Sequence, residues 1–592
     1  MTRVDSEIGV SRLASLIDAF GNGDAQLTAD EVRDFQAKGF GAVLADAAGI
    51  DEFQARSDRF LSEISARGPL RAPPPGLPDV VRFRGHVDAD GTLVARIKAC
   101  RGMIKDPALF QPKNAVALLR WLNQGLAWTR PEKMAFRPGE AKALFQELGQ
   151  FVAEVEDRLY GFGPEYTAQH QDAIVAMNRL RSYVGDYLMI NYREDVLKNE
   201  RLPAFVGKAD GLHVQCYDVG LQSLPDVDAF PDVFLLSMDS GSSAGQCIKR
   251  ITAEDGYESH AALVVRGHDG KHYLVEAGTG HGASAVPLDL PRLFHKKARV
   301  QIHFLRDSAF KDEDAKKAFF NRARDFVDVI KRNRNPYDFT LGHFEVPASG
   351  ESLAIGRETP LMCSSLVQAF FYWCPLDAFA SDAHRENFGM VDPASGKKVA
   401  GYTPFLQAFD SGVGTKSMLD LWHVAGDRTV MPSAVHNPLT RTVAEVRNLE
   451  GDRLERQQIE SAATAFLMNE LLNRRGYALD ESLKAKALRA IVMGLHTITF
   501  RALLPLEGDE MTDEVLETVL THMFAAEPFI EFLQRQNEAY REENGVGMTF
   551  YQLWNAAREA YDQELDARRG GTCPQPKFTN YVMPPELLAA RT

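Results

Sequence analysis

Strand-like patterns are concentrated in one part of this chain, between two long regions of helical periodicity, and this limits the folds open to it. Short apolar runs cover residues 233–236, 261–265 and 273–275, and Val300, Ile302 and Phe304 then alternate with polar residues. Runs of this kind, separated by glycine and polar turns, predict strands near enough in sequence to pair with one another. We therefore expect a small antiparallel sheet.

Two helices are predicted after these strands. Apolar residues at 319, 323, 326 and 330 share one helical face, and a second apolar helix is expected to begin near Cys363 and to end before Pro375. The strands and helices together predict an α+β unit over residues 226–380.

Large, mainly helical regions flank this unit. A proline cluster between Pro69 and Pro78 favours extended backbone and separates an N-terminal helical segment, residues 1–68, from the rest of the chain. Helical periodicity predicts a helical domain over residues 79–225 and a C-terminal helical domain over residues 381–592. We find no internal repeat in the sequence.

Charge and cysteine content exclude several classes of protein. Lys and Arg number 67 against 81 Asp and Glu in 592 residues, and no block of like charge is long enough for a nucleic-acid-binding arm. The six cysteines are too sparse for a disulfide-stapled scaffold, so we expect reduced thiols. The stretch 490–506 is interrupted by His496 and Arg501, so no membrane span is expected. Without a secretory signal pattern we expect a cytoplasmic protein, with delivery by a specialised secretion system left open.

A predicted hairpin carries the first candidate catalytic pair. If it folds about His268, then His260 and Glu276 lie directly opposite each other on neighbouring strands. Side chains in such a pair are about 5 Å apart, so a carboxylate there accepts the imidazole N–H and fixes its tautomer. The same pattern is also typical of a surface hairpin with an incidental ion pair.

Cys363 is the candidate nucleophile. It lies in or next to the first turn of the predicted helix, where the helix dipole and unpaired backbone N–H groups lower a thiol pKa and stabilise an oxyanion. Cys374, at the other end of the helix, is expected to be an inert buried thiol.

The order of these motifs resembles a known family. The strand 232–237, a short helix at 247–250, the two hairpin strands, the Asn-Pro-Tyr-Asp-Phe segment 335–339 and the Cys-Ser-Ser-Leu-Val segment 363–367 follow one another as in the YiiX/YebB-like cysteine hydrolases. These are circularly permuted, NlpC-type members of the papain-like superfamily, related to the lecithin:retinol acyltransferase group. The resemblance covers about residues 230–375.

The resemblance implies a permuted papain-like core and a role for each residue. Cys363 would be the nucleophile, His260 the general base and then acid, and Glu276 the group that orients His260. Tyr337 would line the substrate site or support its wall. The family usually has Glu after the Cys-Ser pair, and this chain departs from that pattern with Ser365.

These residues predict acyl transfer through a thioester, without cofactor or metal. Hydrolysis of an amide or peptide bond is the preferred reaction, and the substrate is expected to be peptide-like or an acylated small molecule. A lipid acyl hydrolase or acyltransferase using the same triad is the first alternative. The second is a binding scaffold with a vestigial hydrolase domain, whose helical flanks hold a protein partner.

Other motifs fit their families less well. The Gly-x-Ser-x-Gly stretch 241–245 is separated from its strand by three residues, so Ser243 is a weaker nucleophile candidate. The His–acid–Cys order also occurs in adenovirus-type and ubiquitin-like-protein proteases, but their residues around the cysteine are absent. The stretch 21–31 resembles an EF-hand loop without its first ligand and its turn glycine, which leaves calcium binding open. The glycines at 278–282 precede no helix, and His213 and Cys216 lack a second pair for zinc.

Overall fold

A computed structural model describes most of the predicted α+β unit and parts of both flanks. The described residues are 93–107, 110–113, 115, 119, 140–162, 165–166, 168–197, 215–218, 227, 230–239, 258–278, 282–297, 299–310, 312–338, 355–374, 406–408, 428–430, 432–436, 439–448, 452–473, 478–479, 509–579 and 582–583. The segment 1–68 with its EF-hand-like stretch, the proline cluster, His213 and the loop containing Ser243 lie outside these residues.

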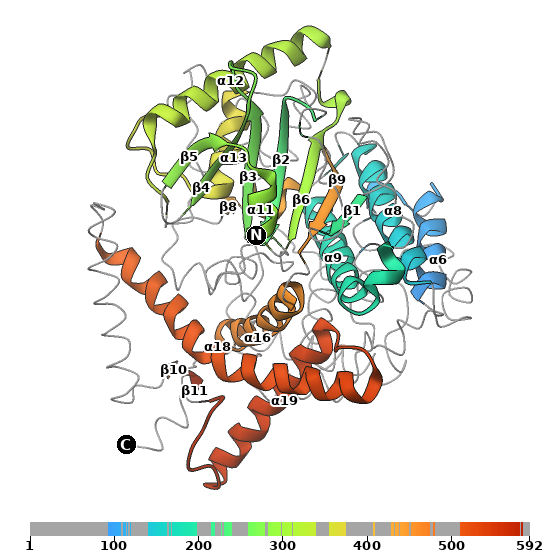
Figure 1. The fold of residues 1–592 in the computed structure, drawn as a ribbon, viewed down its shortest axis with the longest axis vertical. Helices are drawn as coiled ribbons and strands as arrows, with labels where there is room; N and C mark the ends of the chain where they lie inside the picture. The colour runs from blue at the N-terminus through green and yellow to red at the C-terminus, as the bar shows by residue number, and fades with distance from the viewer. Residues whose placement is uncertain are drawn as a thin grey trace, which may run out of the picture.

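A seven-stranded sheet lies at the centre of the described residues (Figure 1). Its strands occur in the order β1-β9-β6-β2-β3-β4-β5, and every neighbouring pair is antiparallel except β1 and β9. The strands are β1 (Gln215–Asp218), β2 (Val233–Asp239), β3 (His260–Arg266), β4 (His272–Gly278), β5 (Gly282–Pro287), β6 (Arg299–Leu305) and β9 (Thr440–Arg447).

Alternate residues of the strands build two hydrophobic cores. On one face, Leu235, Leu263 and Val275 pack with helices α12 (Glu313–Asn333) and α13 (Cys363–Trp373). On the other face, Phe234 and Val264 pack with the short helix α11 (Leu290–Lys296). The strands are therefore apolar on both sides, which explains why they are continuous hydrophobic runs in the sequence.

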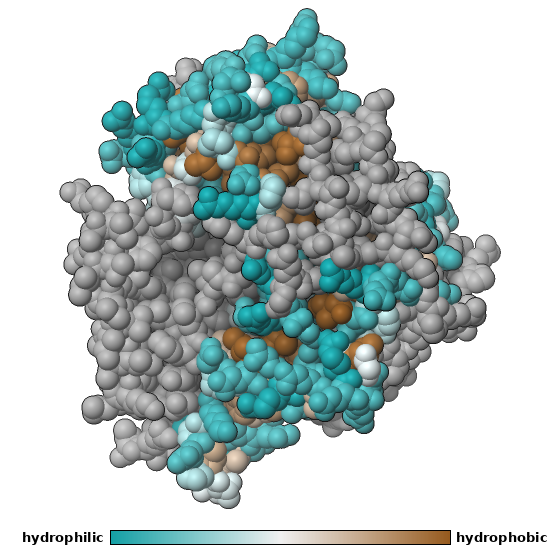
Figure 2. Space-filling view, in the orientation of Figure 1, coloured by the Kyte–Doolittle hydropathy of each residue, from teal (hydrophilic) through white to brown (hydrophobic). Residues whose placement is uncertain are grey.

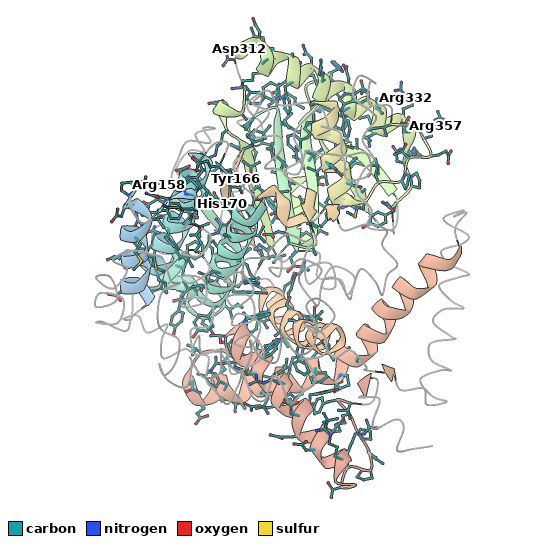
Figure 3. All side chains as sticks on the ribbon, turned by 180° about the vertical axis from the view of Figure 1, so that it is seen from behind. Arg158, Tyr166, His170, Asp312, Arg332 and Arg357 are labelled. Carbon is teal, nitrogen blue, oxygen red and sulfur yellow. The ribbon has the colours of Figure 1, made fainter. Side chains whose placement is uncertain are left out.

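Helix α12 shows how the local sequence sets an element's position. Asp312 caps its first turn by accepting the N–H of Ala315 at 2.8 Å. Basic residues lie in the last turn, where positive charge interacts favourably with the helix dipole. Figure 3 shows Asp312 and Arg332 at the two ends of the helix. The predicted apolar face at 319, 323, 326 and 330 is buried. At the top of Figure 2, where α12 lies, the surface is mostly hydrophilic.

The flanking helices pack mainly on one another, and part of the N-terminal group also contacts the sheet. Helix α6 (Leu93–Lys105) lies on α8 (Ala141–Tyr160), which lies on α9 (Ala168–Leu197); α16 (Arg453–Asn473) packs between α18 (Asp509–Asn544) and α19 (Phe550–Arg569) and also contacts α9. Short pieces complete the described elements: β7 (Leu406–Ala408) with β8 (Arg428–Val430), β10 (Ala478–Leu479) with β11 (Val582–Met583), and the 3-10 helices η4 (Asp307–Ala309) and η6 (Pro432–Val435).

The α+β class is confirmed, and so are the four predicted strands and the two helices after them. The predicted boundaries of the unit, 226–380, do not contain the whole sheet, however. Strand β9 comes from the predicted C-terminal helical domain and β1 from the helical domain before the unit. Both flanks therefore contribute strands. Within the unit alone, β6 would have an unpaired edge, and β9 pairs with that edge at seven positions.

Candidate active site

The structure brings all four predicted site residues together. His260 begins β3, Glu276 lies in β4, Cys363 is the first residue of α13, and Tyr337 follows the end of α12. Since α13 packs on β3 and β4, the start of this helix meets the strand end that carries His260.

The hairpin register differs from the predicted one by two residues. Leu263 pairs with Val275 and Arg266 with His272, and the N–H of Gly267 donates to the carbonyl of Lys271 at 2.8 Å. The prediction that His260 and Glu276 lie directly opposite each other is therefore wrong, because the turn is centred one residue later than His268. An even shift leaves both side chains on the same face, where diagonal neighbours still come into reach.

Glu276 holds one ring nitrogen of His260. The two atoms, His260 Nε2 and Glu276 Oε2, are 2.8 Å apart. A carboxylate can only accept, so Nε2 carries a proton and Nδ1 is left for the thiol. Burial lowers the pKa of His260, but hydrogen bonds with Cys363 and Glu276, and the negative charges of both, raise that pKa to about 9. The imidazole is therefore held in the protonated form at neutral pH.

Cys363 is the opposite member of this pair. Its residue is 2% exposed, and burial raises the pKa of the thiol. The hydrogen bond and positive charge of His260 outweigh burial, with smaller contributions from the Ala261 N–H and the Ser364 hydroxyl, and bring the pKa below its ordinary value. Cys374, at the other end of α13, has a pKa well above its ordinary value because burial outweighs the positive charge of Arg322.

Ser365 closes the N-terminus of the cysteine helix. Its Oγ accepts the N–H of Met362 at 2.8 Å and donates to the Met362 carbonyl at 3.2 Å. In a capping box a Glu at this third helical position reaches back to the same backbone N–H. Ser365 makes that contact with a shorter side chain, so the backbone N–H of Met362 is satisfied without a Glu at this position.

The Asn-Pro-Tyr-Asp segment connects the cysteine helix to the sheet. The Asn335 carbonyl accepts the N–H of Ala283 at the start of β5, at 2.8 Å, and the Pro336 carbonyl accepts the N–H of Leu361 at 2.9 Å. Tyr337 is 7% exposed, and burial, with the negative charges of Cys363 and Asp338, raises its pKa well above the usual range. Tyr337 is thus a buried, neutral phenol within electrostatic reach of Cys363.

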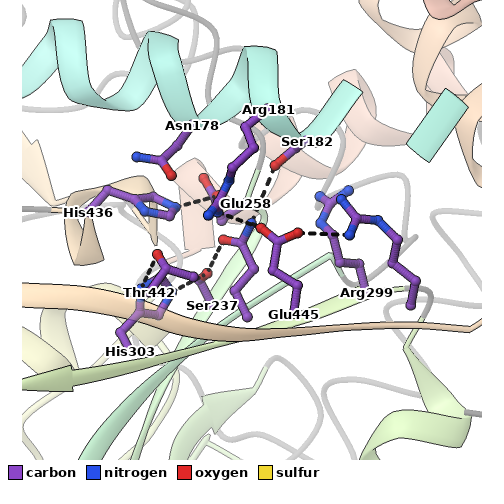
Figure 4. Close-up of polar contacts among 12 residues, drawn as sticks. Asn178, Arg181, Ser182, Ser237, Glu258, Arg299, His303, His436, Thr442 and Glu445 are labelled. Carbon is purple, nitrogen blue, oxygen red and sulfur yellow. Dashed lines mark hydrogen bonds and ion pairs between the residues drawn. The ribbon is translucent and has the colours of Figure 1, made fainter. Parts of the chain in front are cut away.

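A buried polar network on the same sheet was not predicted (Figure 4). It has a histidine cluster and an arginine cluster, which Gln301 joins. The histidine cluster consists of Ser237, Glu258, His303, His436 and Thr442. The arginine cluster consists of Arg181, Asp186, Arg299, Glu445 and Arg447.

The signal for this network is present in β6. Its polar residues at 299, 301 and 303 alternate with apolar ones, a pattern typical of a strand with one solvent-exposed face. In the structure, however, every residue of the strand is buried. Helix α9 lies over that face and supplies Asp186 to Arg299, and the neighbouring strand β9 supplies Glu445 to Gln301. In the sequence, this burial could have been indicated only by acidic residues in distant segments, such as Asp186 and Glu445.

No protein-family model, curated protein or solved structure matches this chain. The geometry of this site is therefore the basis for assigning a function.

Metal clusters and membrane-spanning helices are both missing from the described residues. No three His, Cys, Asp or Glu side chains there lie close enough to hold a metal ion. In the same part of the chain, no helix combines the length and the apolar character needed to cross a membrane.

Proposed function

We propose that this protein is a thiol-dependent acyl-transfer enzyme with a permuted papain-like core, and that Cys363, His260 and Glu276 form its catalytic triad. The observation that carries the proposal is the position of His260, which binds Glu276 through Nε2 and shares a hydrogen bond with Cys363. The raised pKa of His260 and the lowered pKa of Cys363 favour a thiolate–imidazolium pair, which is the reactive form of a cysteine nucleophile.

The reaction follows from this arrangement. The Cys363 sulfur attacks a carbonyl carbon, and the negative charge moves to the carbonyl oxygen, where backbone N–H groups at the start of α13 stabilise it. His260 gives its proton to the leaving amine or alcohol as the bond to the carbonyl carbon breaks. Water, deprotonated by the now neutral His260, then hydrolyses the thioester and restores the thiolate.

Amide or peptide hydrolysis is the preferred reaction, on peptide-like or acylated small-molecule substrates. The triad itself acts equally on an ester, and an alcohol in place of water would make the protein an acyltransferase. Parallel assays with peptide amides and long-chain esters separate these reactions once the thiol is shown to be activated.

The decisive experiment is the pH dependence of iodoacetamide alkylation, measured at each cysteine by peptide mass mapping. Cys573 is partly exposed and serves as a reference thiol in the same molecule. We expect alkylation of Cys363 to persist well below pH about 8.5, where an ordinary thiol loses reactivity. In His260→Ala this low-pH reactivity should disappear while the profile of Cys573 stays unchanged.

One result would contradict the proposal. If the alkylation profile of Cys363 matches that of Cys573 and does not change in His260→Ala, the triad is not active. The binding-scaffold hypothesis would then take its place, and the search would turn to proteins held by the helical flanks. With an identified substrate, full activity in Cys363→Ala would also refute the proposal.

A further inference from the structure

Glu258 lies two residues before His260 and is 3% exposed. Its Oε1 atom is 2.7 Å from Nε2 of His436, which follows η6 in the C-terminal flank and whose side chain is fully buried. Because a carboxylate only accepts, His436 donates this hydrogen bond. A buried carboxylate is costly without such a partner, so the pair fixes the backbone at the start of β3.

Backbone contacts carry this constraint to His260. The N–H of Ser259 donates to the carbonyl of Met238 at 3.0 Å, and the Ser259 hydroxyl reaches Asp239 at 3.4 Å. Met238 is the pairing partner of His260 in β2. The residues directly before the imidazole are therefore tied on one side to β2 and on the other, through Glu258, to His436.

His436 is itself held in place by a second histidine. The rings of His436 and His303 meet edge to face at 4.8 Å, with 83° between their planes. Ser237 donates its hydroxyl proton to Gln301, so it accepts from His303 Nε2 at 2.8 Å. Thr442 then donates to His303 Nδ1 at 3.1 Å.

The imidazole ring of His303 stays neutral. Burial, with the positive charges of His436 and Arg181, holds the pKa of His303 well below its ordinary value. Its tautomer and its orientation are therefore both fixed. Figure 4 shows the hydrogen bond of His303 with Thr442 and that of His436 with Glu258.

We infer that Glu258 is a positioning residue for the thiol site, acting through its buried hydrogen bond to His436 to hold His260 against Cys363 and Glu276. This inference rests on the proposed function and extends it, because it makes the C-terminal flank part of the catalytic apparatus. The histidine cluster orients the general base, whereas the arginine cluster on the same face joins the strands to α9.

The test compares variants of the full chain at Glu258, His436 and Glu445. Glu258→Ala removes the hydrogen bond to His436, Glu258→Gln keeps an acceptor without the charge, and Glu445→Gln removes an equally buried carboxylate from the arginine cluster. Glu445 is 1% exposed and lies on β9, so it is a stringent control for general damage to the sheet. The readout is the pKa of each histidine, obtained from the pH dependence of deuterium exchange at imidazole C2, mapped by peptide mass spectrometry.

We expect Glu258→Ala to lower the pKa of His260 from about 9 by at least about one unit, because His260 loses its alignment with Cys363 and Glu276. Glu258→Gln should keep that pKa near the wild-type value, and Glu445→Gln should leave it unchanged although it destabilises the fold. His436→Ala should reproduce the effect of Glu258→Ala, with no further effect in the double variant.

Other outcomes overturn the inference. An equal drop in Glu258→Gln would mean that the charge acts directly, and an equal drop in Glu445→Gln would mean general loss of structure. An unchanged His260 pKa in Glu258→Ala would show that the pair does not position the imidazole. Because this readout needs no reaction at the thiol, it is independent of whether Cys363 proves reactive in wild type.

Discussion

His260 is subject to two opposing effects, and their balance decides what the thiol can do. Burial favours the neutral imidazole, while Glu276 and Cys363 favour the imidazolium, and the partners prevail with a pKa of about 9. The pKa of Cys363 is lowered by the same contact, against its own burial. The two groups therefore titrate as a pair, and a change at one is expected to appear at the other.

Glu276→Gln tests this coupling. The amide oxygen can still accept the proton of His260 Nε2, but the negative charge is lost, so the pKa of His260 falls. With less imidazolium beside it, the Cys363 thiol ionises at higher pH. We expect the inflection of the Cys363 alkylation profile to rise by about 1 to 3 pH units, and by no more than in His260→Ala. An unchanged profile would show that the charge of Glu276 does not reach the thiol.

At the scale of elements, the site depends on how α13 and β5 are joined. The Asn335–Tyr337 segment hydrogen-bonds to β5 on one side and to the approach to Cys363 on the other. Gly282, at the start of β5, has φ of +66°, and a Cβ there would lie 2.1 Å from the Asn335 carbonyl oxygen. Only glycine allows the two segments to approach this closely.

Gly282→Ala should therefore disturb the site from a distance. The added methyl group displaces Asn335 and with it the segment that supports Tyr337 and the start of α13. We expect loss of low-pH alkylation at Cys363 together with a lower unfolding midpoint.

Gly270→Ala is the matched control for this change. Gly270 has φ of +78°, and a Cβ added there would meet no atom within 4 Å, so this variant carries the backbone strain without the clash. It should cost about 1–2 kcal/mol of stability and leave the alkylation profile as in wild type. Equal effects of the two variants would show that the contact with Asn335 does not support the site.

At the scale of the whole molecule, the sheet that carries the proposed triad is completed by both flanks. Strand β9 covers the edge of β6, and α9 supplies Asp186 to the buried Arg299 at 3.0 Å. Glu445 has a pKa of about 2, because Arg181, Arg447 and Arg299 outweigh its burial. The central unit and the flanks thus share a sheet and a set of buried charges.

A fragment limited to residues 226–380 should fail to fold. It exposes the edge of β6 that β9 covers in the full chain, and it lacks α9, the helix that buries Arg299 and supplies its partner Asp186. We expect it to aggregate and to show no cooperative unfolding by circular dichroism. A fragment spanning 93–448, which retains α9 and β9, is the comparison and should be the more soluble and cooperative of the two. Cooperative unfolding of the short fragment would show that the flanks are dispensable.

The predicted elements and the predicted site have different origins in the sequence. Apolar period and turn residues are local, and they were sufficient for β2, β3, β4, β6, α12 and α13. They also made Cys363, His260 and Glu276 candidates, whose roles were implied by the resemblance in motif order. The hairpin register was wrong by two residues, but its face was right, because an even shift preserves the alternation of side chains.

The remaining features depend on parts of the chain that are far apart in sequence. Pairing of β9 with β6 and burial of the charges on β6 follow from the packing of α9 and β9, which no local pattern encodes. The same holds for Glu258, whose partner His436 belongs to another segment. Local patterns thus determined which residues form these strands and helices and which are candidates for the site. Tertiary packing decided which strands are neighbours and which charges are buried, since both require segments that the sequence separates.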